Sequence, residues 1–505
     1  MVNITDDFTA TLPYSLWTAE QVKQAEPQLA EQGKISLDQL MERAGTGSYH
    51  LLRCHWPDAR RLLIIAGGGN NGGDGLVVAR LAAEQGFTVE LLLHGDPVHF
   101  PNEASCAWQK LQGANVRMLD TLSQAGPCDV VIDALLGSGL KGAVRSDCID
   151  LITQMNALNS PVLALDIPSG LSADTGQPLG IAVKATATIT FIGIKQGLLT
   201  GQAAAYCGDI LYSNLGLSKP LENWHKGRVQ RGDYARFKKW LPFRSVIAHK
   251  GYFGRVVLLG GDYGTAGAIR LAGEACQRTG AGLIEVLTRP EHLSIVLSGR
   301  PELMAHGLTL TDQVQLSRSI QQASVLVVGP GLGQSDWSKW LWQYALESDK
   351  PLVLDADGLN LLAQEPKARG NWILTPHPGE AARLLACQVR DVEQDRFAAA
   401  IKIARRYDAV VVLKGAGTIV ATPDEQCYVL AVGNPGMASG GMGDVLSGII
   451  GGLLAQHVPA VDAACLAVCL HGEAADRAAV NGQRGMLAGD LLPEIRVLVN
   501  PEQME

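Results

Sequence analysis

The sequence predicts an α/β protein with two domains, each a mainly parallel sheet covered by helices on both faces. The chain has 505 residues, more than one compact core usually holds. Short apolar runs that end in Gly, Asp or Ser alternate with helical stretches, as expected for strands buried on both faces. A polar, basic, tryptophan-containing stretch at about 217–250 interrupts this alternation, so we expect the domain boundary there.

Composition limits the classes of partner. The net charge of −8 and the isoelectric point near 5.8 disfavour a broad nucleic-acid surface, because binding phosphates requires clustered Lys and Arg. One basic segment, 226–250, carries eight Lys and Arg against a single Asp. We interpret it as a solvated interdomain segment, with an anion-facing rim as the alternative.

The sequence also predicts a cytoplasmic protein without a membrane partner. The first residues, "MVNITDDFTATLPYS", lack an apolar segment, and the most apolar run, "VLSGIIGGLLA", is too short and glycine-rich to span a bilayer. The ten cysteines contain no CxxC pair, which is typical of free thiols in a reducing compartment.

The first half begins with two helices and continues as alternating strands and helices. Capping boxes predict the helix starts, Thr18 with Gln21 and Ser36 with Gln39. The expected strands lie in 61–68, 87–95, 128–137 and 161–170, with a helix over 74–86.

The second half repeats this rhythm with different spacing. Expected strands lie in 254–261, 282–288, 324–333, 351–360, 372–380 and 409–417, with helices over 265–280, from about 440 and from about 460. Because the halves share no period, we expect two different α/β domains rather than a duplication.

A glycine-rich loop, "AGGGNNGGDG" at 66–75, matches the G-x-G-x-x-G pattern of dinucleotide-binding domains. Such a domain also needs an acidic residue after the second strand. Glu90 lies inside the apolar run "VELLL" and Asp96 comes beyond it, so a hydride-transfer oxidoreductase is disfavoured. The loop instead carries polar side chains that this pattern does not require, namely Asn70, Asn71 and Asp74.

A second glycine-rich stretch, "GNPGMASGGMGDVLSGIIGGLLA" at 433–455, predicts an anion site. Gly440, Gly441 and Gly443 immediately precede an apolar helix, whose first N–H groups and dipole favour a negative charge. Asp444 falls in the first helical turn, where a carboxylate can accept a proton from a hydroxyl that attacks a phosphoryl group. The alternative is that Asp444 only stabilises the helix terminus.

The loop "LKGAGTIV" at 413–420 follows a strand and can hold nucleotide phosphates, although it is not a Walker A sequence. Together with the Gly-Gly-x-Gly-Asp helix start, it resembles the ribokinase-like superfamily. His377 lies between two prolines at an expected strand end, which favours a ligand contact. Glu380 falls in the first turn of the following helix.

In combination, these motifs resemble those of the bifunctional NAD(P)H-hydrate repair enzymes. The strings are "GNNGGDG", "DALLGSGLKG" and "DIPSGL" in the first half, and "GTAGA", "GPGLG", "TPHPGE", "KGAGT" and "SGGMGD" in the second. The resemblance implies a Rossmann-like three-layer epimerase domain at 1–218, a linker at 219–248 and a ribokinase-like dehydratase domain at 249–505.

For the epimerase domain, the resemblance implies a site for hydrated NADH and NADPH (NADHX and NADPHX) and a potassium ion. The potassium ligands would be Asn71, Asp133 and Ser169, whose oxygen donors suit an alkali cation. We expect Asp166 to be the catalytic acid or base, with Lys141 as the alternative. The implied substrate-binding residues are Asn70, Asn71, Gly72, Gly73, Asp74, Gly137, Ser138, Gly139, Leu140, Lys141, Gly142, Ala143 and Asp166.

For the dehydratase domain, the resemblance implies phosphorylation and dehydration at the C6 hydroxyl, with Mg²⁺ and ADP or ATP. The family favours ADP, whereas the loop itself leaves the donor open. Asp444 would be catalytic, and we expect a homo-oligomer. The implied substrate contacts are Ala268, Gly333, His377 and Asp444, and the implied nucleotide contacts are Lys414, Gly415, Ala416, Gly417, Thr418 and Gly443.

Two other functions stay open from the sequence. A small-alcohol kinase would use the same anion site and aspartate, but it has no evident use for "GNNGGDG". The first domain could instead be a binding module without catalysis of its own.

Overall fold

The computed structural model describes residues 8–217, 221 and 227–500, which form two compact units, Met1–Gln230 and Arg231–Glu505. Residues 219, 220 and 222–226 of the expected linker lie outside the described residues. Within the rest of that stretch, Val229–Arg231 forms strand β10 and Tyr234–Phe237 forms helix α6. The domain limits drawn from the sequence therefore stay a prediction.

The capping boxes at the start of the first unit are confirmed. Helix α1 (Ala19–Gly33) follows Thr18, whose side chain accepts a hydrogen bond from Gln21 N at 3.2 Å. Helix α2 (Leu37–His55) begins in the same way after Ser36. Such caps stabilise a helix by about 1 kcal/mol each, because they pair N–H groups that the helix leaves open.

The sheet of the first unit has seven strands in the order β4-β3-β2-β5-β6-β7-β9, and all neighbours are parallel. The strands are β2 (Arg61–Gly67), β3 (Thr88–His94), β4 (Val116–Leu119), β5 (Val130–Ala134), β6 (Val162–Leu165), β7 (Ala187–Phe191) and β9 (Asp209–Ser213). Short strands β1 (Ser15–Trp17) and β8 (Ile194–Lys195) pair with each other outside this sheet.

Helices cover both faces of this sheet. In β2, Leu62 and Ile64 belong to the apolar core that includes α1, α2, α3 (Asn70–Glu84) and α4 (Asn102–Leu111), whereas Leu63 and Ile65 belong to the core that includes α5 (Ser146–Ala157). The two-residue period of the strand thus sends alternate apolar side chains into two cores. The expected three-layer α/β/α arrangement is confirmed.

The second unit has nine strands in the order β13-β12-β11-β14-β15-β16-β17-β18-β19. Neighbours from β13 to β17 are parallel, and β18 and β19 join antiparallel. The strands are β11 (Arg255–Leu259), β12 (Leu283–Thr288), β13 (Met304–Gly307), β14 (Val325–Val328), β15 (Leu352–Leu354), β16 (Trp372–Leu374), β17 (Val410–Leu413), β18 (Thr418–Ala421) and β19 (Cys427–Leu430).

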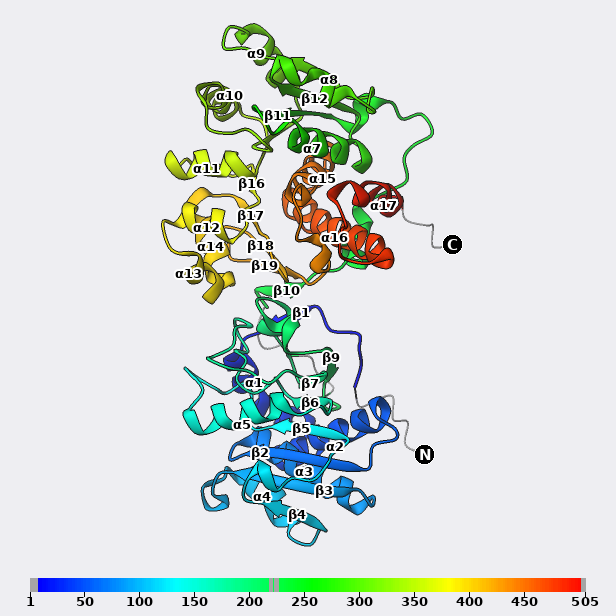
Figure 1. The fold of residues 1–505 in the computed structure, drawn as a ribbon, viewed down its shortest axis with the longest axis vertical. Coiled ribbons are helices and arrows are strands. Elements are labelled where there is room, and N and C mark those ends of the chain that lie inside the picture. The colour runs from blue at the N-terminus through cyan, green and yellow to red at the C-terminus, as the bar shows by residue number, and fades with distance from the viewer. Residues whose placement is uncertain (1–7, 218–220, 222–226, 501–505) are drawn as a thin grey trace. The chain divides into compact units, whose positions relative to one another are not determined.

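Two layers of helices enclose the second sheet, as Figure 1 shows. One face carries α7 (Ala266–Thr279), α15 (Met442–Ala455), α16 (Ala460–Ala478) and α17 (Leu491–Leu498), which share one apolar core with the strands. On the other side lie α10 (Asp336–Glu347), α11 (Ala356–Gln364), α12 (Pro378–Leu385) and α14 (Arg396–Tyr407). The remaining helices are α8 (Leu293–Leu297), α9 (Gln313–Gln322) and α13 (Val389–Gln394).

The parallel strands determine where a ligand can bind. In an open parallel sheet, ligands contact the loops at the carboxyl ends of the strands. Motif loops follow β2, β5 and β6 in the first unit, and β11, β14, β16 and β17 in the second. Within the described residues, the structure contains no helix with the length and apolar character that crossing a bilayer requires.

Candidate active sites

The glycine-rich loop of the first unit connects β2 to α3 through close backbone contacts. A Cβ atom on Gly67 would lie 2.0 Å from the carbonyl oxygen of Leu135, and one on Gly72 would lie 1.8 Å from the carbonyl oxygen of Gly67. Glycine is therefore required at both positions for packing. A Cβ on Gly69 would meet nothing within 4 Å, so that glycine leaves room at the mouth of the loop.

A cavity of about 1380 Å³ lies beside this loop and gathers most of the expected epimerase residues. Gly73 does not line it, and a Cβ there would lie 2.6 Å from the side chain of Met41. Gly142 and Ala143 do not line the cavity either. The expected residues that do line it are Asn70, Asn71, Gly72, Asp74, Gly137, Ser138, Gly139, Leu140, Lys141 and Asp166.

Asp166 and Lys195 form an ion pair in the lining of this cavity. Asp166 directly follows β6, and its Oδ2 accepts a hydrogen bond from the N–H of Ser138 at 3.0 Å. Lys195 is 2% exposed and also donates to Thr190 Oγ1 at 3.2 Å. Burial acts to raise the pKa of Asp166, but the charge and hydrogen bond of Lys195 outweigh it and hold that pKa below its usual value. Asp166 is therefore ionised.

Two further carboxylic acids border the cavity without such a partner. Burial raises the pKa of Asp74 well above its usual value, and the negative charges of Asp166 and Glu26 raise it further. Burial likewise raises the pKa of Glu26. The cavity thus combines carboxyl groups of raised pKa, Asp74 and Glu26, with an ionised carboxylate, Asp166, an arrangement that suits acid–base chemistry.

The expected potassium ligands lie in two groups. Asp133 and Ser169 are fully buried, and Ser169 Oγ donates to Asp133 Oδ1 at 2.5 Å. All hydrogen bonds to Asp133 come from neutral groups, and burial raises its pKa to about 6. Both amide atoms of Asn71 are buried and have no hydrogen-bond partner within the described part of the chain. A buried carboxylate without a counter-charge and an unpaired amide oxygen fit a hard monovalent cation.

In the second unit, Asp355 organises the expected nucleotide site. It directly follows β15 and is 1% exposed. Its Oδ1 accepts hydrogen bonds from Lys414 Nζ and Thr375 Oγ1, both at 2.8 Å, and its Oδ2 accepts one from Ser447 Oγ at 2.6 Å. Burial acts to raise the pKa of Asp355, but Lys414 and these hydrogen bonds hold it below its usual value.

Asp444 lies in the first turn of α15, as expected from the sequence. Gly441 precedes this helix with φ 90° and provides no side-chain cap, so the first N–H groups point toward the site. Burial raises the pKa of Asp444 to about 7, and the nearby charge of Asp355 adds to the effect while Lys414 opposes it. A carboxyl group with this pKa can act as a base near neutral pH.

The loop from Lys414 to Thr418 follows β17, and hydrogen bonds from Arg396 hold its first residues in place. This buried arginine donates to the carbonyl oxygens of Leu413 and Lys414, both at 3.2 Å. A Cβ on Gly415, where φ is 143°, would lie 2.8 Å from the Arg396 guanidinium. The loop therefore approaches the guanidinium closely and needs glycine at this position.

His377 caps α12, in a capping box with Glu380. His377 N donates to Glu380 Oε2 at 2.8 Å, and Gly379 N donates to His377 Nδ1 at 3.0 Å. Burial and the positive charge of Lys414 lower the pKa of His377, so the imidazole is neutral near pH 7. Glu380 also lies 3.8 Å from Lys414 Nζ, which joins this helix start to the phosphate loop.

Hydrogen bonds also connect the loops that carry Ala268 and Gly333. Ala268 N donates to Thr265 O, and Thr265 Oγ1 donates to Gly331 O at 2.7 Å. Gly333, with φ 69°, donates its N–H to Asp357 Oδ2 at 2.8 Å. The expected substrate loops thus adjoin the helix that follows Asp355.

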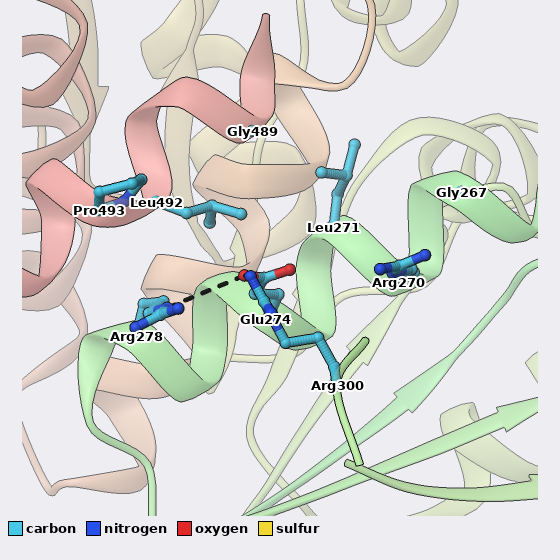
Figure 2. A pocket seen from close by; sticks show the side chains of 9 residues that line it. All are labelled: Gly267, Arg270, Leu271, Glu274, Arg278, Arg300, Gly489, Leu492 and Pro493. Atoms are coloured by element: carbon cyan, nitrogen blue, oxygen red, sulfur yellow. Dashed lines mark ion pairs between the residues drawn. The ribbon is translucent and has the colours of Figure 1, made fainter. Parts of the chain in front are cut away.

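A separate cavity of the second unit, about 360 Å³, lies between α7 and α17 (Figure 2). The buried Glu274 pairs with Arg278 and Arg300, and Arg270 lies elsewhere along the same cavity. Leu271 in this cavity packs near Gly441, since a Cβ on Gly441 would lie 2.7 Å from it. None of the expected dehydratase residues lines this cavity.

The sequence interpretation missed several polar residues of both sites. Asp355 lies in the segment "PLVLDADGLN" at 351–360, and its place directly after an apolar strand was the available signal. Lys195 is a lone lysine within the mostly apolar run "FIGIKQGLL", a position where charge is unusual. Ser447 and Asp357 carry no comparable signal.

The folds and the two sets of polar side chains define a two-part α/β enzyme with a ligand cavity in the first unit and an anion site in the second. Residues 37–197 match the family model described as YjeF-related protein N-terminus, and residues 256–496 match the model described as NAD(P)H-hydrate dehydratase. Curated relatives match the chain across both of these regions.

The bifunctional NAD(P)H-hydrate repair enzyme Nnr of Coxiella burnetii is 47% identical over 490 residues, covering 96% of this chain and 99% of the relative. The enzyme of the same name from Escherichia coli is 46% identical, covering 97% and 95%. The chain belongs to the family of bifunctional NAD(P)H-hydrate repair enzymes. It combines an NAD(P)H-hydrate epimerase with an ADP- or ATP-dependent NAD(P)H-hydrate dehydratase.

Solved structures match the second unit. A ribokinase-like superfamily protein from Enterococcus faecalis is 29% identical with a TM-score of 0.51, covering 55% of this chain and 98% of that one. The ADP/ATP-dependent NAD(P)H-hydrate dehydratase of Bacillus subtilis, co-crystallised with ATP and Mg²⁺, is 30% identical with a TM-score of 0.48, covering 52% and 95%. The predicted family, fold class and enzyme activity are confirmed.

The buried Asp166–Lys195 pair leads to a prediction about stability. Lys195→Met is expected to destabilise the first unit by about 3 kcal/mol, because it leaves the Asp166 carboxylate buried without its counter-charge. Asp166→Asn combined with Lys195→Met should recover part of this loss. Urea unfolding of the two single variants and the double variant measures the coupling. Additive effects of the two changes would contradict the pairing.

Proposed function

We propose that the second unit phosphorylates the C6 hydroxyl of the hydrated nicotinamide with Asp444 as the base. The observation that carries this proposal is the position of Asp444, with a pKa of about 7, at the open start of α15 and near the charged Lys414. The hydroxyl proton passes to Asp444 while the hydroxyl oxygen attacks the terminal phosphoryl group of the nucleotide. The first N–H groups of α15 and Lys414 stabilise the charge that develops on that group.

Loss of phosphate then restores the ring. The lone pair of the ring nitrogen expels phosphate from C6, the C6–O bond breaks, and departure of a C5 proton forms the double bond of NADH or NADPH. Mg²⁺ enters as the complex with ADP or ATP, on the loop Lys414–Thr418 and Gly443. Neutral His377, with Ala268 and Gly333, contacts the substrate. A domain at 249–505 would contain all of these groups.

In the first unit, we propose that Asp166 and Asp74 share the acid–base work of epimerisation. The hydroxyl at C6 departs with the help of the ring nitrogen, and a proton from the raised-pKa carboxyl of Asp74 assists it. Ionised Asp166 then accepts a proton from the water that returns to either face. Lys141, which is 87% exposed, is the weaker alternative to Asp166. A domain at 1–218, followed by a linker at 219–248, would contain this site.

We also propose that potassium binds at Asn71, Asp133 and Ser169, where the unpaired amide of Asn71 and the uncompensated carboxylate of Asp133 support it. The ion would supply the positive charge that this buried group lacks.

A homo-oligomer in the cytoplasm is the assembly we expect. Phe243, Val246 and Ile247 expose their apolar side chains, as at an interface between copies.

One experiment tests the combined function. A mixture of R and S hydrated NADPH is incubated with Mg²⁺ and either ADP or ATP, and the absorbance of reduced nicotinamide is followed. The full enzyme should recover the absorbance expected for all of the hydrated NADPH. Asp166→Ala should recover only the fraction that was present as the S epimer, which is the substrate of the dehydratase. No recovery would contradict the proposal. A phosphorylated product that does not lose phosphate would also contradict it and would identify a kinase instead. If Asp166→Ala recovers the full absorbance and Lys141→Ala does not, the acid–base role in epimerisation belongs to Lys141.

Asp444→Asn should reduce the dehydration rate by at least about a hundredfold, because the substituted amide cannot accept the hydroxyl proton. Nucleotide affinity, measured by calorimetry, should stay within about threefold. Asp462→Asn is the matched control, since Asp462 also lies in the first turn of a helix, α16. Rapid turnover by Asp444→Asn would rule out its role as base.

The pH dependence of dehydration should follow the ionisation of Asp444. Its base form is lost as pH falls through about 7, so kcat/KM should decrease about tenfold per pH unit below that value and level off above it. Initial rates over a range of buffers measure the profile. A profile without a transition near neutrality would contradict the assignment.

Potassium should stabilise the first unit more as pH rises. Because the pKa of Asp133 is raised to about 6 in the folded protein, folding binds a proton there, and stability decreases as pH rises through about 6. Potassium bound to the ionised carboxylate should offset this loss, so the potassium-dependent increase in Tm should be larger at about pH 8 than at about pH 5. Choline at equal ionic strength is the control salt.

Asp133→Asn should abolish the potassium effect on Tm. Asp129→Asn should retain it, since Asp129 pairs with Arg61. An equal potassium effect in Asp133→Asn would overturn the proposed ligand set.

A further inference from the structure

A His–Asp–Cys cluster that the repair reaction does not use lies at the carboxyl end of the first sheet. His94 is the last residue of β3, and Asp147 and Cys148 are the second and third residues of α5. The fold thus joins residues that are more than fifty positions apart in the chain. His94 and Asp147 also line the rim of the large cavity, whereas Cys148 is 1% exposed and lies behind them.

The donor atoms of this cluster are already spaced as in a tetrahedral metal site. His94 Nε2 lies 3.2 Å from Asp147 Oδ2 and 3.6 Å from Cys148 Sγ, and the three atoms all lie within 4.8 Å of one another. Zinc bonds of roughly 2.3 Å to sulfur and about 2.0 Å to nitrogen or oxygen require separations of about 3.5 Å for S–N and about 3.3 Å for N–O. Little rearrangement is therefore needed to place an ion between these atoms.

The hydrogen bonds around Asp147 leave one of its oxygens directed toward the cluster. Its Oδ1 accepts a hydrogen bond from Cys148 N at 3.0 Å and faces Arg145 Nε at 3.7 Å, whereas Oδ2 faces His94. One carboxylate oxygen is thus held by the start of α5, and the other remains as a ligand. On binding, a divalent ion would displace the thiol proton of Cys148 to solvent, and the resulting thiolate and the Asp147 carboxylate would together neutralise its charge.

We propose that His94, Asp147 and Cys148 form a binding site for a borderline transition-metal ion of the Zn²⁺ class. The combination of imidazole, carboxylate and thiolate donors suits Zn²⁺ or Co²⁺ and does not suit K⁺ or Mg²⁺, which prefer oxygen alone. Three protein ligands leave a fourth position for water or another donor. The site does not depend on the proposed residue roles in epimerisation or dehydration.

The test titrates the full-length protein, freed of metal by a chelator, with Co²⁺ as the spectroscopic probe. Binding should produce a thiolate-to-cobalt charge-transfer band and the visible bands of tetrahedral Co²⁺, and Zn²⁺ should displace both. Cys148→Ser should abolish the charge-transfer band, and His94→Ala and Asp147→Asn should each weaken Zn²⁺ binding by at least about tenfold. Absence of the band in the unchanged protein, or its persistence in Cys148→Ser, would overturn the proposal.

Two matched controls separate this site from general metal binding. Cys128→Ser removes another thiol of the first unit, one that contacts Ser160. His55→Ala removes another histidine of the first unit, one that pairs with Asp209 at 3.8 Å. Both should retain full Co²⁺ binding.

Circular dichroism establishes that each variant is folded. If Cys148→Ser does not fold, His94→Ala and Asp147→Asn decide the question, because unchanged Zn²⁺ affinity in either variant would overturn the site. Displacement of Co²⁺ by equimolar K⁺ or Mg²⁺ would overturn it as well.

Discussion

A buried aspartate paired with a lysine is the interaction around which each unit is organised. The pairs Asp166–Lys195 and Asp355–Lys414 occupy corresponding places, because each aspartate directly follows a parallel strand, β6 or β15. Burial penalises either charge alone, so each pair persists only because both members are present and further hydrogen bonds satisfy them. In both units burial raises the pKa of a second carboxyl group, Asp74 or Asp444, and the charge of the ionised aspartate raises it further.

This arrangement explains how two unrelated reactions can use similar groups. In the first unit, burial and the charges of Asp166 and Glu26 raise the pKa of Asp74 well above its usual value, which suits an acid. In the second unit, burial raises the pKa of Asp444 to about 7, the charge of Asp355 adds to this effect and Lys414 opposes it, so the group can serve as a base near neutral pH. The start of α15 then adds the anion site that phosphoryl transfer needs.

The sequence predicted the elements whose causes are local. Capping boxes located the starts of α1 and α2, and long apolar runs located most of the central strands. Strand β13 (Met304–Gly307) was missed, because it is short, half-exposed and lies at the edge of its sheet. The motifs predicted that Asp166 and Asp444 belong to the sites. The contacts of Lys195 with Asp166 and of Ser447 with Asp355 join distant parts of the chain, so the motifs did not predict them. The G-x-G-x-x-G match reflects backbone proximity at Gly67 and Gly72, which a strand–turn–helix junction requires whatever its chemistry.

The backbone beside each paired aspartate is held in an unfavourable conformation. Asp166 has φ 65°, and Ala356, which follows Asp355, has φ 47°; both values lie in the left-handed region that residues with a Cβ seldom adopt. Strain of this kind amounts to roughly 1 kcal/mol or more at each position and must be offset by the surrounding sheet and its two helical layers. In each unit, the backbone conformation that orients the carboxylate therefore lowers the free energy of unfolding. Selection for thermal stability alone would favour glycine at these two positions, and it would do so at the expense of the geometry on which repair depends.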